Sequence, residues 1–534
     1  MKILVLSDSH GNISNMEAAV EREQPRMILH LGDCWRDAER LAERYPEIPM
    51  EHVPGNCDYR PEEPAEKLLF LGDCRVLICH GHTYGVKTSL LAAGYKAEQD
   101  NLDAFLFGHT HKPLVDRRGK TLFLNPGTIG RGVRPTYAVL TAEGVNLFND
   151  EMDPIDKPHS HIDWDVSAAE KGGYPHFMLK EIFEQPEAIR KTVSPRVREG
   201  RVVLDDLRLT KGYIQGVSRI FIVACGSSYH VGMVSKYNWE RLLRRPVEVC
   251  LASEFRYCDP LVDDHSLVIF ISQSGETLDT MAALREAKRR GGRTLAVVNV
   301  VGSSIAREAD DVLYTWAGPE IAVATTKAYS TQLVLMDLIA LYLGDLLGTI
   351  EKTEYDTILH ELEVLPEKLE RVLASIEDVK YFASRYFNHD SIFFIGRNLD
   401  YAMGLEGSLK LKEISYIHSE AYASGELKHG TISLIEPGTL VVALGTYEPL
   451  FDKAMSNVVE VKARGAEVLA LATEPFKEKM AHTADSVIAV PETHPVVQPS
   501  LGVVPLQLFA YYVALQRGCD IDKPRNLAKS VTVE

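Results

Sequence analysis

The chain has 534 residues, of which 45% are hydrophobic and 25% are charged. A chain of this length is too long for one hydrophobic core, so several domains of roughly 100–200 residues each are expected. Its 75 Asp and Glu residues outnumber its 58 Lys and Arg residues, and the resulting net charge of −17 repels polyanions, which excludes nucleic acid as an expected partner.

Short β-branched runs alternate with turn signals over residues 1–150. The runs "KILVLSD", "MILHLGD", "RVLICHGH" and "AFLFGHTH" each carry a polar cluster directly after the apolar residues. Because α/β sheets build their sites at strand ends, His, Asp and Asn at these positions are candidate site residues. The first run is too short for a signal peptide and is broken by Asp8. This region is predicted to be an α/β domain.

Residues 151–175 hold Pro, Gly and charge without an apolar period, so they are predicted to be a linker. A second α/β region follows, and it contains an internal repeat. Residues 266–299 and 439–473 share the order strand, polar turn, amphipathic helix, Arg-Gly, strand. Gly291 and Gly465 occupy equivalent places, where a helix C-cap glycine is expected.

The repeat predicts two doubly wound subdomains with parallel sheets, within residues 176–350 and 380–515. Apolar residues at helical spacing predict a helical linker over 351–379, and residues 516–534 form a C-terminal tail. The longest apolar run, residues 331–348, carries two aspartates, so no membrane-spanning segment is expected. Eight scattered cysteines are typical of reduced thiols, which favours a cytoplasmic protein.

Seven polar residues in the first region form one candidate site. They are Asp8 and His10 in "SDSHGN", Asp33 in "LGDC", Asn56 in "PGNCD", His80 in "CHGH", and His109 and His111 in "GHTH". Such ligands from adjacent strands suit a pair of divalent transition ions about 3.5–4 Å apart, with one carboxylate as the bridge. Any one of them alone could instead be a turn or capping residue. Their joint occurrence favours a two-metal site.

These stretches resemble the motifs of the calcineurin-like metallophosphoesterases, specifically the small bacterial phosphodiesterase branch, over residues 1 to about 148. The resemblance implies a four-layer α/β/β/α sandwich and a phosphodiester substrate. It also implies two metal ions, with manganese expected and other first-row ions able to serve. One ion would be bound by Asp8, His10 and His111, the other by Asn56, His80 and His109, with Asp33 as the bridge. Larger family members have His where this chain has Cys57, so the group that protonates the leaving group stays open.

A second candidate site follows the strand "LVIFIS". Backbone amides at a helix N-terminus, with the side chains of Ser272, Gln273, Ser274 and Thr277, form a predicted cradle for a phosphate dianion. The alternative is a simple N-cap cluster, because Ser and Thr favour caps without any ligand. The equivalent turn of the repeat, "LGTYEP", lacks the Ser-Gln-Ser set and carries an acid, so one cradle per chain is expected.

With this turn, the stretches "CGSSYH", "EIAVATTKAYSTQL", "LKLKEISYIHSEAYASGELKHG" and "KPRNLAKSVTVE" resemble the paired sugar isomerase (SIS) domains of the glucosamine-6-phosphate synthase family, over roughly residues 163–534. The resemblance implies that Ser228 joins the cradle around the phosphate of a hexose 6-phosphate. It implies that Val323 and Thr325 line the sugar.

The same resemblance implies the catalytic roles. Glu413 would move a proton between C1 and C2, His429 would open the sugar ring, and Lys529 would form a Schiff base with the open-chain ketone. Lys410 would be a positive charge beside them. Glu413 and Lys410, three residues apart on a predicted helix, could otherwise be a solvated ion pair.

Family members begin with a glutaminase whose nucleophile is a cysteine after the first Met, whereas Lys2 and a phosphodiesterase-like domain stand here. The sequence therefore predicts a bifunctional enzyme, a metal phosphodiesterase fused to an isomerase converting fructose 6-phosphate to glucose 6-phosphate or, with ammonia, to glucosamine 6-phosphate. A separate glutaminase is the expected ammonia-supplying partner. The resemblance implies a homodimer through the SIS region, with sites completed by the neighbouring subunit.

An alternative is that the SIS half senses an amino-sugar phosphate and regulates the phosphodiesterase. The presence of Glu413, His429 and Lys529 argues against it, since a sensor needs the cradle but not the proton-transfer groups. The tail that carries Lys529 is expected to act as a lid over the sugar.

Overall fold

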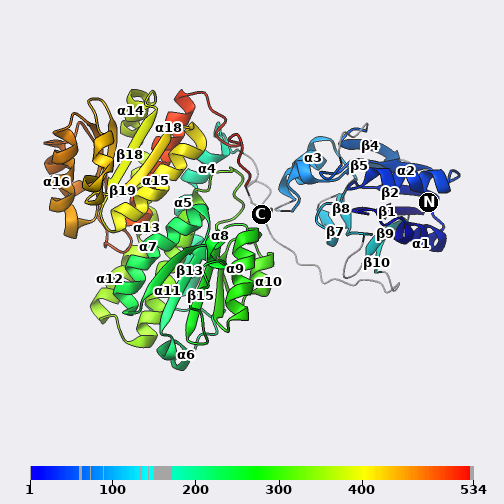
Figure 1. Cartoon of the computed structure of the whole chain (residues 1–534), viewed down its shortest axis with the longest axis horizontal. Helices are drawn as coiled ribbons and strands as arrows, with labels where there is room; N and C mark the ends of the chain where they lie inside the picture. The colour runs from blue at the N-terminus through cyan, green and yellow to red at the C-terminus, as the bar shows by residue number, and fades with distance from the viewer. Residues whose placement is uncertain are drawn as a thin grey trace. The chain divides into compact units, whose positions relative to one another are not determined.

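The computed structural model describes residues 2–58, 63–71, 74–87, 90–118, 120–130, 135–141, 144–149 and 171–529. The chain divides into two compact units, Met1–Asp163 and Trp164–Glu534 (Figure 1). The linker predicted over residues 151–175 lies almost entirely outside the described residues.

The first unit is built on two five-stranded sheets. One has the order β10-β9-β1-β2-β3 and consists of β1 (Ile3–Leu6), β2 (Met27–His30), β3 (Met50–His52), β9 (Thr136–Thr141) and β10 (Gly144–Asn149). The other has the order β4-β5-β6-β8-β7 and consists of β4 (Glu66–Leu71), β5 (Cys74–Cys79), β6 (Ala104–Phe107), β7 (Pro113–Arg118) and β8 (Thr121–Pro126). The strands β1, β2 and β3 are parallel, as are β5, β6 and β8.

The inner faces of the two sheets pack together, with Val5 and Leu29 from one and Ile78 and Leu106 from the other in a single buried cluster. The helices α1 (Ile13–Glu23) and α2 (Trp35–Arg44) contribute to a cluster on the outer face of the first sheet. The helix α3 (Leu91–Gln99) packs on the outer face of the second. The predicted four-layer α/β/β/α sandwich is confirmed.

The second unit contains two parallel five-stranded sheets with the same strand order. The first is β14-β13-β15-β16-β17, made of β13 (Arg219–Ala224), β14 (Val247–Leu251), β15 (Ser266–Ser272), β16 (Arg293–Val298) and β17 (Asp311–Tyr314). The second is β19-β18-β20-β21-β22, made of β18 (Ser391–Gly396), β19 (His418–Ala423), β20 (Leu440–Gly445), β21 (Glu467–Thr473) and β22 (Ser486–Val490). The two halves of this unit therefore have the same topology, as the internal repeat in the sequence predicts.

The helices of this unit are α4 (Phe177–Phe183), α5 (Gln185–Val193), α6 (Lys211–Gly216), α7 (Gly226–Leu243), α8 (Ala252–Phe255), α9 (Leu278–Arg289), α10 (Ser304–Glu308), α11 (Lys327–Leu347), α15 (Leu399–Ser415), α16 (Phe451–Lys462), α17 (Lys477–Ala481) and α18 (Gln498–Gln516). The segment predicted as a helical linker contains α12 (Lys352–Glu363) and α13 (Leu365–Ala374), followed by α14 (Glu377–Tyr386). Gly291 and Gly465 follow α9 and α16 with φ of +91° and +87°, the left-handed conformation that ends a helix.

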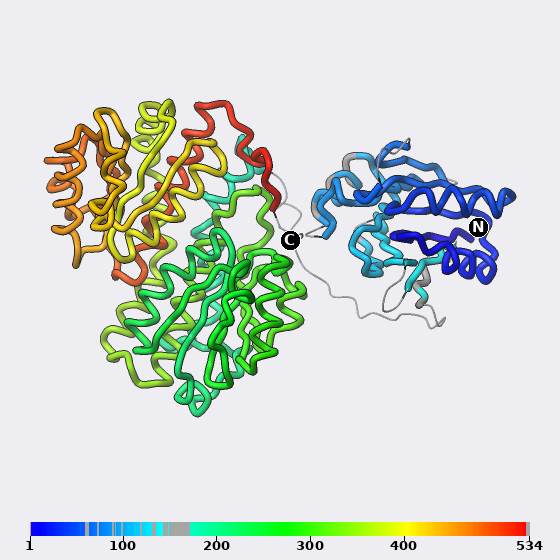
Figure 2. The backbone as a smooth tube through the Cα atoms, viewed as in Figure 1, coloured from blue at the N-terminus to red at the C-terminus, as the bar shows by residue number. Residues whose placement is uncertain are grey.

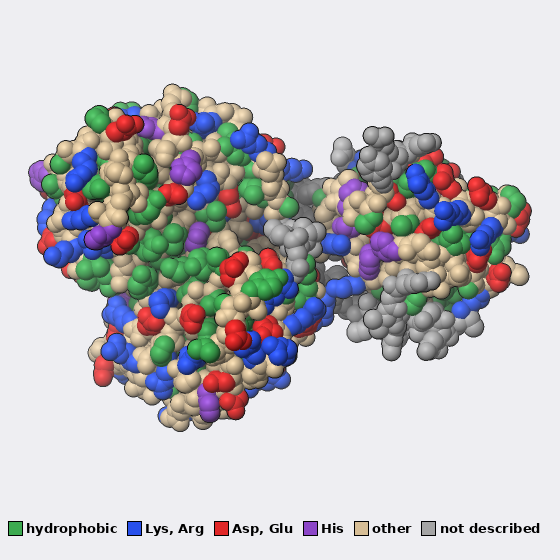
Figure 3. All heavy atoms as spheres, in the orientation of Figure 1, with side chains coloured by type: hydrophobic (Ala, Val, Ile, Leu, Met, Phe, Trp, Pro, Cys, Tyr) green, Lys and Arg blue, Asp and Glu red, His purple; other side chains and the backbone are tan. Residues whose placement is uncertain are grey.

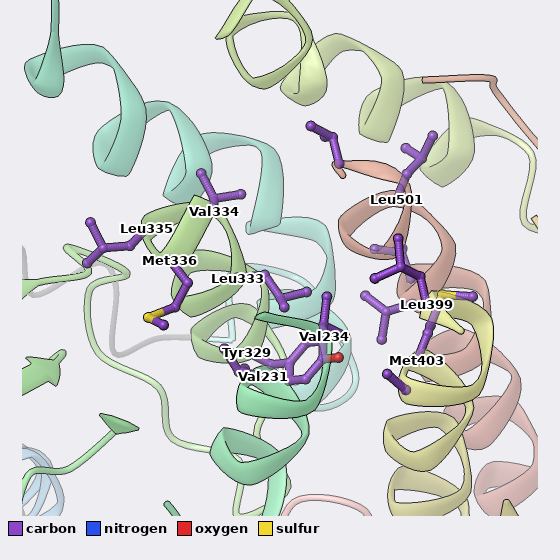
Figure 4. Close-up of a cluster of buried hydrophobic side chains, with 14 of the residues drawn as sticks. Val231, Val234, Tyr329, Leu333, Val334, Leu335, Met336, Leu399, Met403 and Leu501 are labelled. Carbon is purple, nitrogen blue, oxygen red and sulfur yellow. The ribbon is translucent and has the colours of Figure 1, made fainter. Parts of the chain in front are cut away.

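Helices α7, α11, α15 and α18 share one core between the two sheets (Figure 4). Val231, Leu333, Met403 and Leu501 meet there, one from each helix. The helix α11 is long and apolar enough to cross a membrane, but 78% of its most apolar window is buried inside the protein. Its composition is therefore explained by its place in the core.

Acidic and basic side chains are interspersed on the face of the second unit that Figure 3 shows. That pattern, together with the net charge of −17, offers no extended basic surface on this face for a polyanion.

Candidate metal centre and sugar-phosphate site

The seven residues predicted to bind metal lie in the loops that follow β1, β2, β3, β5 and β6, at one edge of the two sheets. Five of them have positive φ, namely Asp8 (+55°), His10 (+44°), Asp33 (+56°), His109 (+67°) and His111 (+55°). Residues other than glycine are strained in this conformation, and such strain is held mainly where side chains must be aimed at a functional site.

The first group of donor atoms contains Asp8, His10, Asp33 and His111, all within 4.8 Å of one another. Nε2 of His111 lies 3.0 Å from Oδ1 of Asp8 and 3.3 Å from Nε2 of His10. Oδ1 of Asp8 is buried and has no hydrogen-bond partner in the part of the chain that the structure describes. Acceptor atoms that converge without a donor fit a divalent cation.

The second group is centred on His80. Its Nε2 lies 3.1 Å from Oδ1 of Asn56, 3.2 Å from Nδ1 of His109 and 3.4 Å from Oδ1 of Asp33. Its Nδ1 lies 2.7 Å from the carbonyl oxygen of Leu31, so Nδ1 is assigned the proton and Nε2 is left as an acceptor. Asp33 takes part in both groups, since its Oδ2 lies 4.0 Å from Nε2 of His10.

Two further carboxylates, not singled out from the sequence, hold these loops in place. Asp58 accepts hydrogen bonds from the backbone N–H of Cys34 (2.8 Å) and Gly55 (2.7 Å), so it ties the loop after β3 to the loop after β2. Asp37 accepts from the Ser9 hydroxyl and the backbone N–H of Gly11 at 2.8 and 2.7 Å. Their sequence signal is weak, because an Asp beside a turn has many other uses.

Cys57 stands where larger family members have His, and it is exposed. Burial of the thiol, and then its contact with Asp33, raise its pKa to about 11. The thiol is therefore protonated at neutral pH. His82 lies close by, half-buried, with its ring centroid 5.5 Å from that of His80.

The predicted phosphate cradle lies at the carboxyl edge of the adjacent strands β13 and β15. The hydroxyls of Ser272 and Ser274 accept hydrogen bonds from the backbone N–H of Gly275 (3.0 Å) and Glu276 (3.2 Å), so they also close the turn. Thr277 is the N-cap residue of α9 but makes no side-chain cap. Ser228, in the first turn of α7, donates to Gln332 at 3.0 Å. Gln273 is half-buried in the same turn. The Thr277 hydroxyl lies 3.4 Å from that of Ser272 and does not cap α9, so the N-cap alternative does not account for Thr277.

Gly275 makes this turn possible, because its φ is +64° and an added Cβ would lie 2.0 Å from Oγ of Ser303. We expect Gly275→Ala to shift the cradle and to weaken hexose 6-phosphate binding about tenfold or more, which is about 1.4 kcal/mol. Calorimetric titration measures it. Gly302→Ala is the control, since Gly302 also has positive φ (+69°) but open space around it. Equal affinity of Gly275→Ala and the wild type would contradict the assignment.

In the equivalent turn of the repeat, a side chain of the protein occupies the place that a phosphate would take. The carboxylate of Asp400 accepts from the backbone N–H of Thr446 and Tyr447, both at 3.0 Å, and from the Thr446 hydroxyl at 2.5 Å. These amides follow β20 as the cradle amides follow β15. The arrangement supports the expectation of one phosphate cradle per chain.

Helix α15 carries Lys410 and Glu413 next to the core. Nζ of Lys410 lies 2.5 Å from Oε2 of Glu413 and 3.4 Å from Oε1 of Glu406. Burial would lower the pKa of Lys410, but the charges of Glu406 and Glu413 more than offset it, and the net shift is upward. Lys410 is fully buried, which excludes the alternative of a solvated pair.

Glu406 was not predicted from the sequence, although it lies one helical turn before Lys410. It accepts hydrogen bonds from Ser227 (2.9 Å) and from Nδ1 of His230 (2.8 Å), both on α7. Glu406 therefore connects the helix that follows β13, at the cradle, to the helix that carries Glu413.

The C-terminal tail lies against the loop that holds Val323 and Thr325, both half-buried (Figure 2). The carbonyl oxygen of Asp522 accepts from the backbone N–H of Val323 at 3.0 Å. Nζ of Lys529 lies 2.5 Å from Oε2 of Glu320. The tail is therefore docked beside the predicted sugar-binding residues.

The side chain of Asp522 also fixes the tail, because it accepts hydrogen bonds from the backbone N–H of Phe177 (2.9 Å) and Met178 (3.0 Å) at the start of α4.

We expect Asp522→Ala to cost about 0.5–2 kcal/mol of local stability. Trypsin cleavage after the exposed Arg525 should then become several-fold faster. Limited proteolysis with mass spectrometry measures this, with Asp264→Ala, at an exposed carboxylate outside the tail, as the control. Unchanged cleavage would mean that this contact does not hold the tail.

His429, predicted to open the sugar ring, makes no hydrogen bond or ion pair with the other predicted catalytic residues, Lys410, Glu413 and Lys529, among the residues that the structure describes. It is exposed at the end of a 3-10 helix, Glu426–His429.

Family models match both units of the chain. The calcineurin-like phosphoesterase superfamily domain matches residues 1–144, and the SIS domain matches residues 213–342 and 385–517. The chain thus joins a calcineurin-like phosphoesterase domain to a pair of SIS domains.

Proteins of known name are similar to the second unit of the chain. The chain is 57% identical over 399 residues to the isomerizing glutamine–fructose-6-phosphate aminotransferase of Clostridium acetobutylicum, covering 74% of this chain and 66% of that protein. It is 47% identical over 423 residues to the same enzyme of Thermus thermophilus, covering 79% and 68%. The solved C-terminal domain of glucosamine-fructose-6-phosphate aminotransferase from Francisella tularensis matches at 38% identity and a TM-score of 0.64, covering 66% of this chain and all of that one. The chain belongs to the isomerizing glutamine–fructose-6-phosphate aminotransferase family.

Proposed function

We propose that the protein is a bifunctional enzyme, a metal-dependent phosphodiesterase and a hexose-phosphate isomerase. The second activity would interconvert fructose 6-phosphate and glucose 6-phosphate or, with ammonia, form glucosamine 6-phosphate. The observation that carries it is the buried Lys410 paired with Glu413, on a helix linked through Glu406 to the cradle side of the sugar site. Burying such an ion pair costs desolvation free energy, so its position beside the cradle supports a chemical role for it.

In the first unit, Asp8, His10 and His111 would hold one divalent ion, and Asn56, His80 and His109 the other, with Asp33 between them. When bound, two such ions, manganese being the one expected, supply positive charge for the phosphoryl oxygens and activate water. The bond from His80 to Leu31 keeps its ring oriented. The protonated thiol of Cys57 lies beside Asp33, to which its backbone N–H donates at 2.9 Å.

In the second unit, the turn 272–277 and Ser228 would hold the phosphate, and Val323 and Thr325 would line the sugar. Glu413 would take the proton from C1 or C2 and return it to the other carbon. Lys410 keeps the carboxylate of Glu413 oriented through the 2.5 Å contact. Lys529 would form the imine with the open-chain ketone.

His429 would open the sugar ring, and its exposure supports a homodimer in which it serves the neighbouring subunit's site. Ammonia would come from solution or from a separate glutaminase, and the enzyme would work in the cytoplasm.

A coupled assay with glucose-6-phosphate dehydrogenase tests the isomerase. Purified protein and fructose 6-phosphate should give steady glucose 6-phosphate formation, and parallel reactions with ammonium or glutamine should be assayed for glucosamine 6-phosphate. Ammonium, and not glutamine, should support amination. Hexose phosphate binding without turnover would instead favour a sensor that regulates the phosphodiesterase.

A further inference from the structure

Two buried carboxyl groups, those of Glu320 and Glu181, interact with Lys529. Glu320 lies in the loop between β17 and α11 and is 7% exposed, and Glu181 lies on α4 and is 2% exposed. Oε2 of Glu320 is the atom that contacts Nζ of Lys529 at 2.5 Å. Its Oε1 accepts from the backbone N–H of Thr326 (2.9 Å) and Ala328 (3.1 Å). These two bonds fix the carboxylate so that one oxygen faces the amine.

Glu181 approaches the same loop from the other side. Its Oε1 accepts from the backbone N–H of Ile321 (2.5 Å) and Ala322 (3.2 Å), the two residues after Glu320. Its Oε2 is buried and makes no hydrogen bond among the described residues. A carboxyl whose one oxygen takes two N–H groups and whose other oxygen is unpaired is suited to carry a proton on the unpaired oxygen.

The charges around Glu181 agree with a protonated acid. Burial first, and then the charge of Glu320, raise the pKa of Glu181 to about 8, while Lys529 and Lys327 oppose the shift. Lys327 is itself paired with Glu184, at 2.7 Å. Burial would also raise the pKa of Glu320, but the charge and hydrogen bond of Lys529 with the two amides lower it. Glu181 is therefore a neutral acid at neutral pH, and Glu320 is the carboxylate that faces Nζ of Lys529.

An ammonium has no lone pair, so Lys529 must lose a proton before it can add to a carbonyl. We propose that Glu320 is the base that takes this proton, and that Glu181 is a positioning residue that holds the loop of Glu320 while remaining a neutral acid. The proposal rests on the isomerase function proposed above. Its observational basis is the contact of Oε2 of Glu320 with the reacting nitrogen.

The step balances without any other reactant. An N–H bond of the ammonium breaks, its electron pair stays on nitrogen, and the proton goes to Oε2 of Glu320. The lone pair then forms the N–C2 bond, the C=O pair moves to oxygen, and a proton shifts from nitrogen to that oxygen. Glu320 returns its proton to the hydroxyl, the C–O bond breaks with its pair on the leaving water, and an iminium and a carboxylate remain.

Borohydride trapping tests the proposal, because it reduces the imine and leaves the sugar attached to the chain, where mass spectrometry counts it. Glu320→Gln should slow both trapping and isomerisation of fructose 6-phosphate about 10²-fold or more, with hexose phosphate binding within about threefold. Glu320→Asp keeps a carboxylate, so its trapping and isomerisation rates should be at least about tenfold higher than those of Glu320→Gln. Glu361→Gln is the matched control, because it removes the carboxylate of another partly buried ion pair, that with Lys368. Its rates of trapping and isomerisation should equal those of the wild type.

Glu181→Gln gives a second readout, since glutamine resembles the neutral acid. The variant should match the wild type within about twofold at pH 6.5, where Glu181 is protonated. Above pH 8 the wild-type Glu181 ionises and adds a negative charge that opposes the transfer of a proton away from Lys529, so the ratio of variant to wild-type trapping rate should rise several-fold by pH 9. A merely structural Glu181 would give a ratio that does not change with pH.

Equal trapping by Glu320→Gln and the wild type would overturn the inference and leave the isomerase function in place. A wild type that neither isomerises nor traps the sugar would overturn the proposed function, and the inference with it. Thermal melting, with and without hexose phosphate, shows whether Glu320→Gln folds. If it does not fold, the inference is tested by how the ratio of Glu181→Gln to wild-type trapping rates changes with pH. A flat ratio then overturns the inference.

Discussion

Replacing Asp33 by asparagine should reduce phosphodiester hydrolysis about 10³-fold or more and leave hexose phosphate conversion unchanged. Asp33 contacts both groups of donors, since its oxygens lie 3.4 Å from Nε2 of His80 and 4.0 Å from Nε2 of His10. Burial would raise the pKa of Asp33, but the hydrogen bond and charge of His80 and the amide of Cys57 hold it well below its ordinary value. The carboxylate is therefore charged across the whole working pH range, and an amide cannot replace that charge.

Hydrolysis of bis-p-nitrophenyl phosphate with Mn²⁺ measures the activity, and elemental analysis counts the bound ions. Asp100→Asn is the matched control, because Asp100 pairs with Lys96 at 3.0 Å in the same unit, away from the donor groups. Asp33→Asn should lose bound metal as well as activity. Full metal content with full hydrolysis would refute the bridging role.

Replacing Lys529 by alanine should abolish isomerisation, by about 10³-fold or more, with phosphodiester hydrolysis unchanged. The amine lies in the docked tail against Glu320, beside the loop of Val323 and Thr325. Lys529→Arg keeps a cation for Glu320 but offers no nucleophilic amine, so it should be as inactive as the alanine variant.

The coupled assay for glucose 6-phosphate measures both variants. Lys523→Ala serves as the control, since Lys523 is an exposed lysine of the same tail. Activity of Lys529→Arg near that of the wild type would mean that Lys529 acts through its charge alone, and imine formation would be excluded.

Much of the first site could be predicted, because its residues follow apolar strands directly and parallel strands bring their carboxyl ends to one edge. His80 and His109, 29 residues apart, meet at 3.2 Å for this reason. Asp58 could not be predicted, because its role is to accept backbone N–H groups from a loop 24 residues earlier. No local pattern encodes that contact.

In the second unit, the repeat and the glycine-ended helices were visible as sequence periodicity, and the strand order confirms them. The roles of the buried acids Glu181 and Asp400 could not be predicted from that periodicity. Glu181 contacts Ile321 across 140 positions, and its burial depends on how α4 packs. Asp400 fills the second turn from a neighbouring helix, which the acid inside "LGTYEP" did not predict. His429 is exposed at the end of its 3-10 helix, a placement that a motif does not report.

The most direct test of the central claim is deuterium incorporation. The intact protein is incubated with fructose 6-phosphate in D₂O, and the sugars are followed by NMR, with Glu413→Gln alongside. Because the carboxyl proton of Glu413 can exchange with solvent between the two transfers, we expect the wild type to form glucose 6-phosphate with deuterium at C2 in part of the product, and Glu413→Gln to form it about 10²-fold or more slowly. Recovery of fructose 6-phosphate unchanged, with no glucose 6-phosphate and no deuterium, would contradict the central claim.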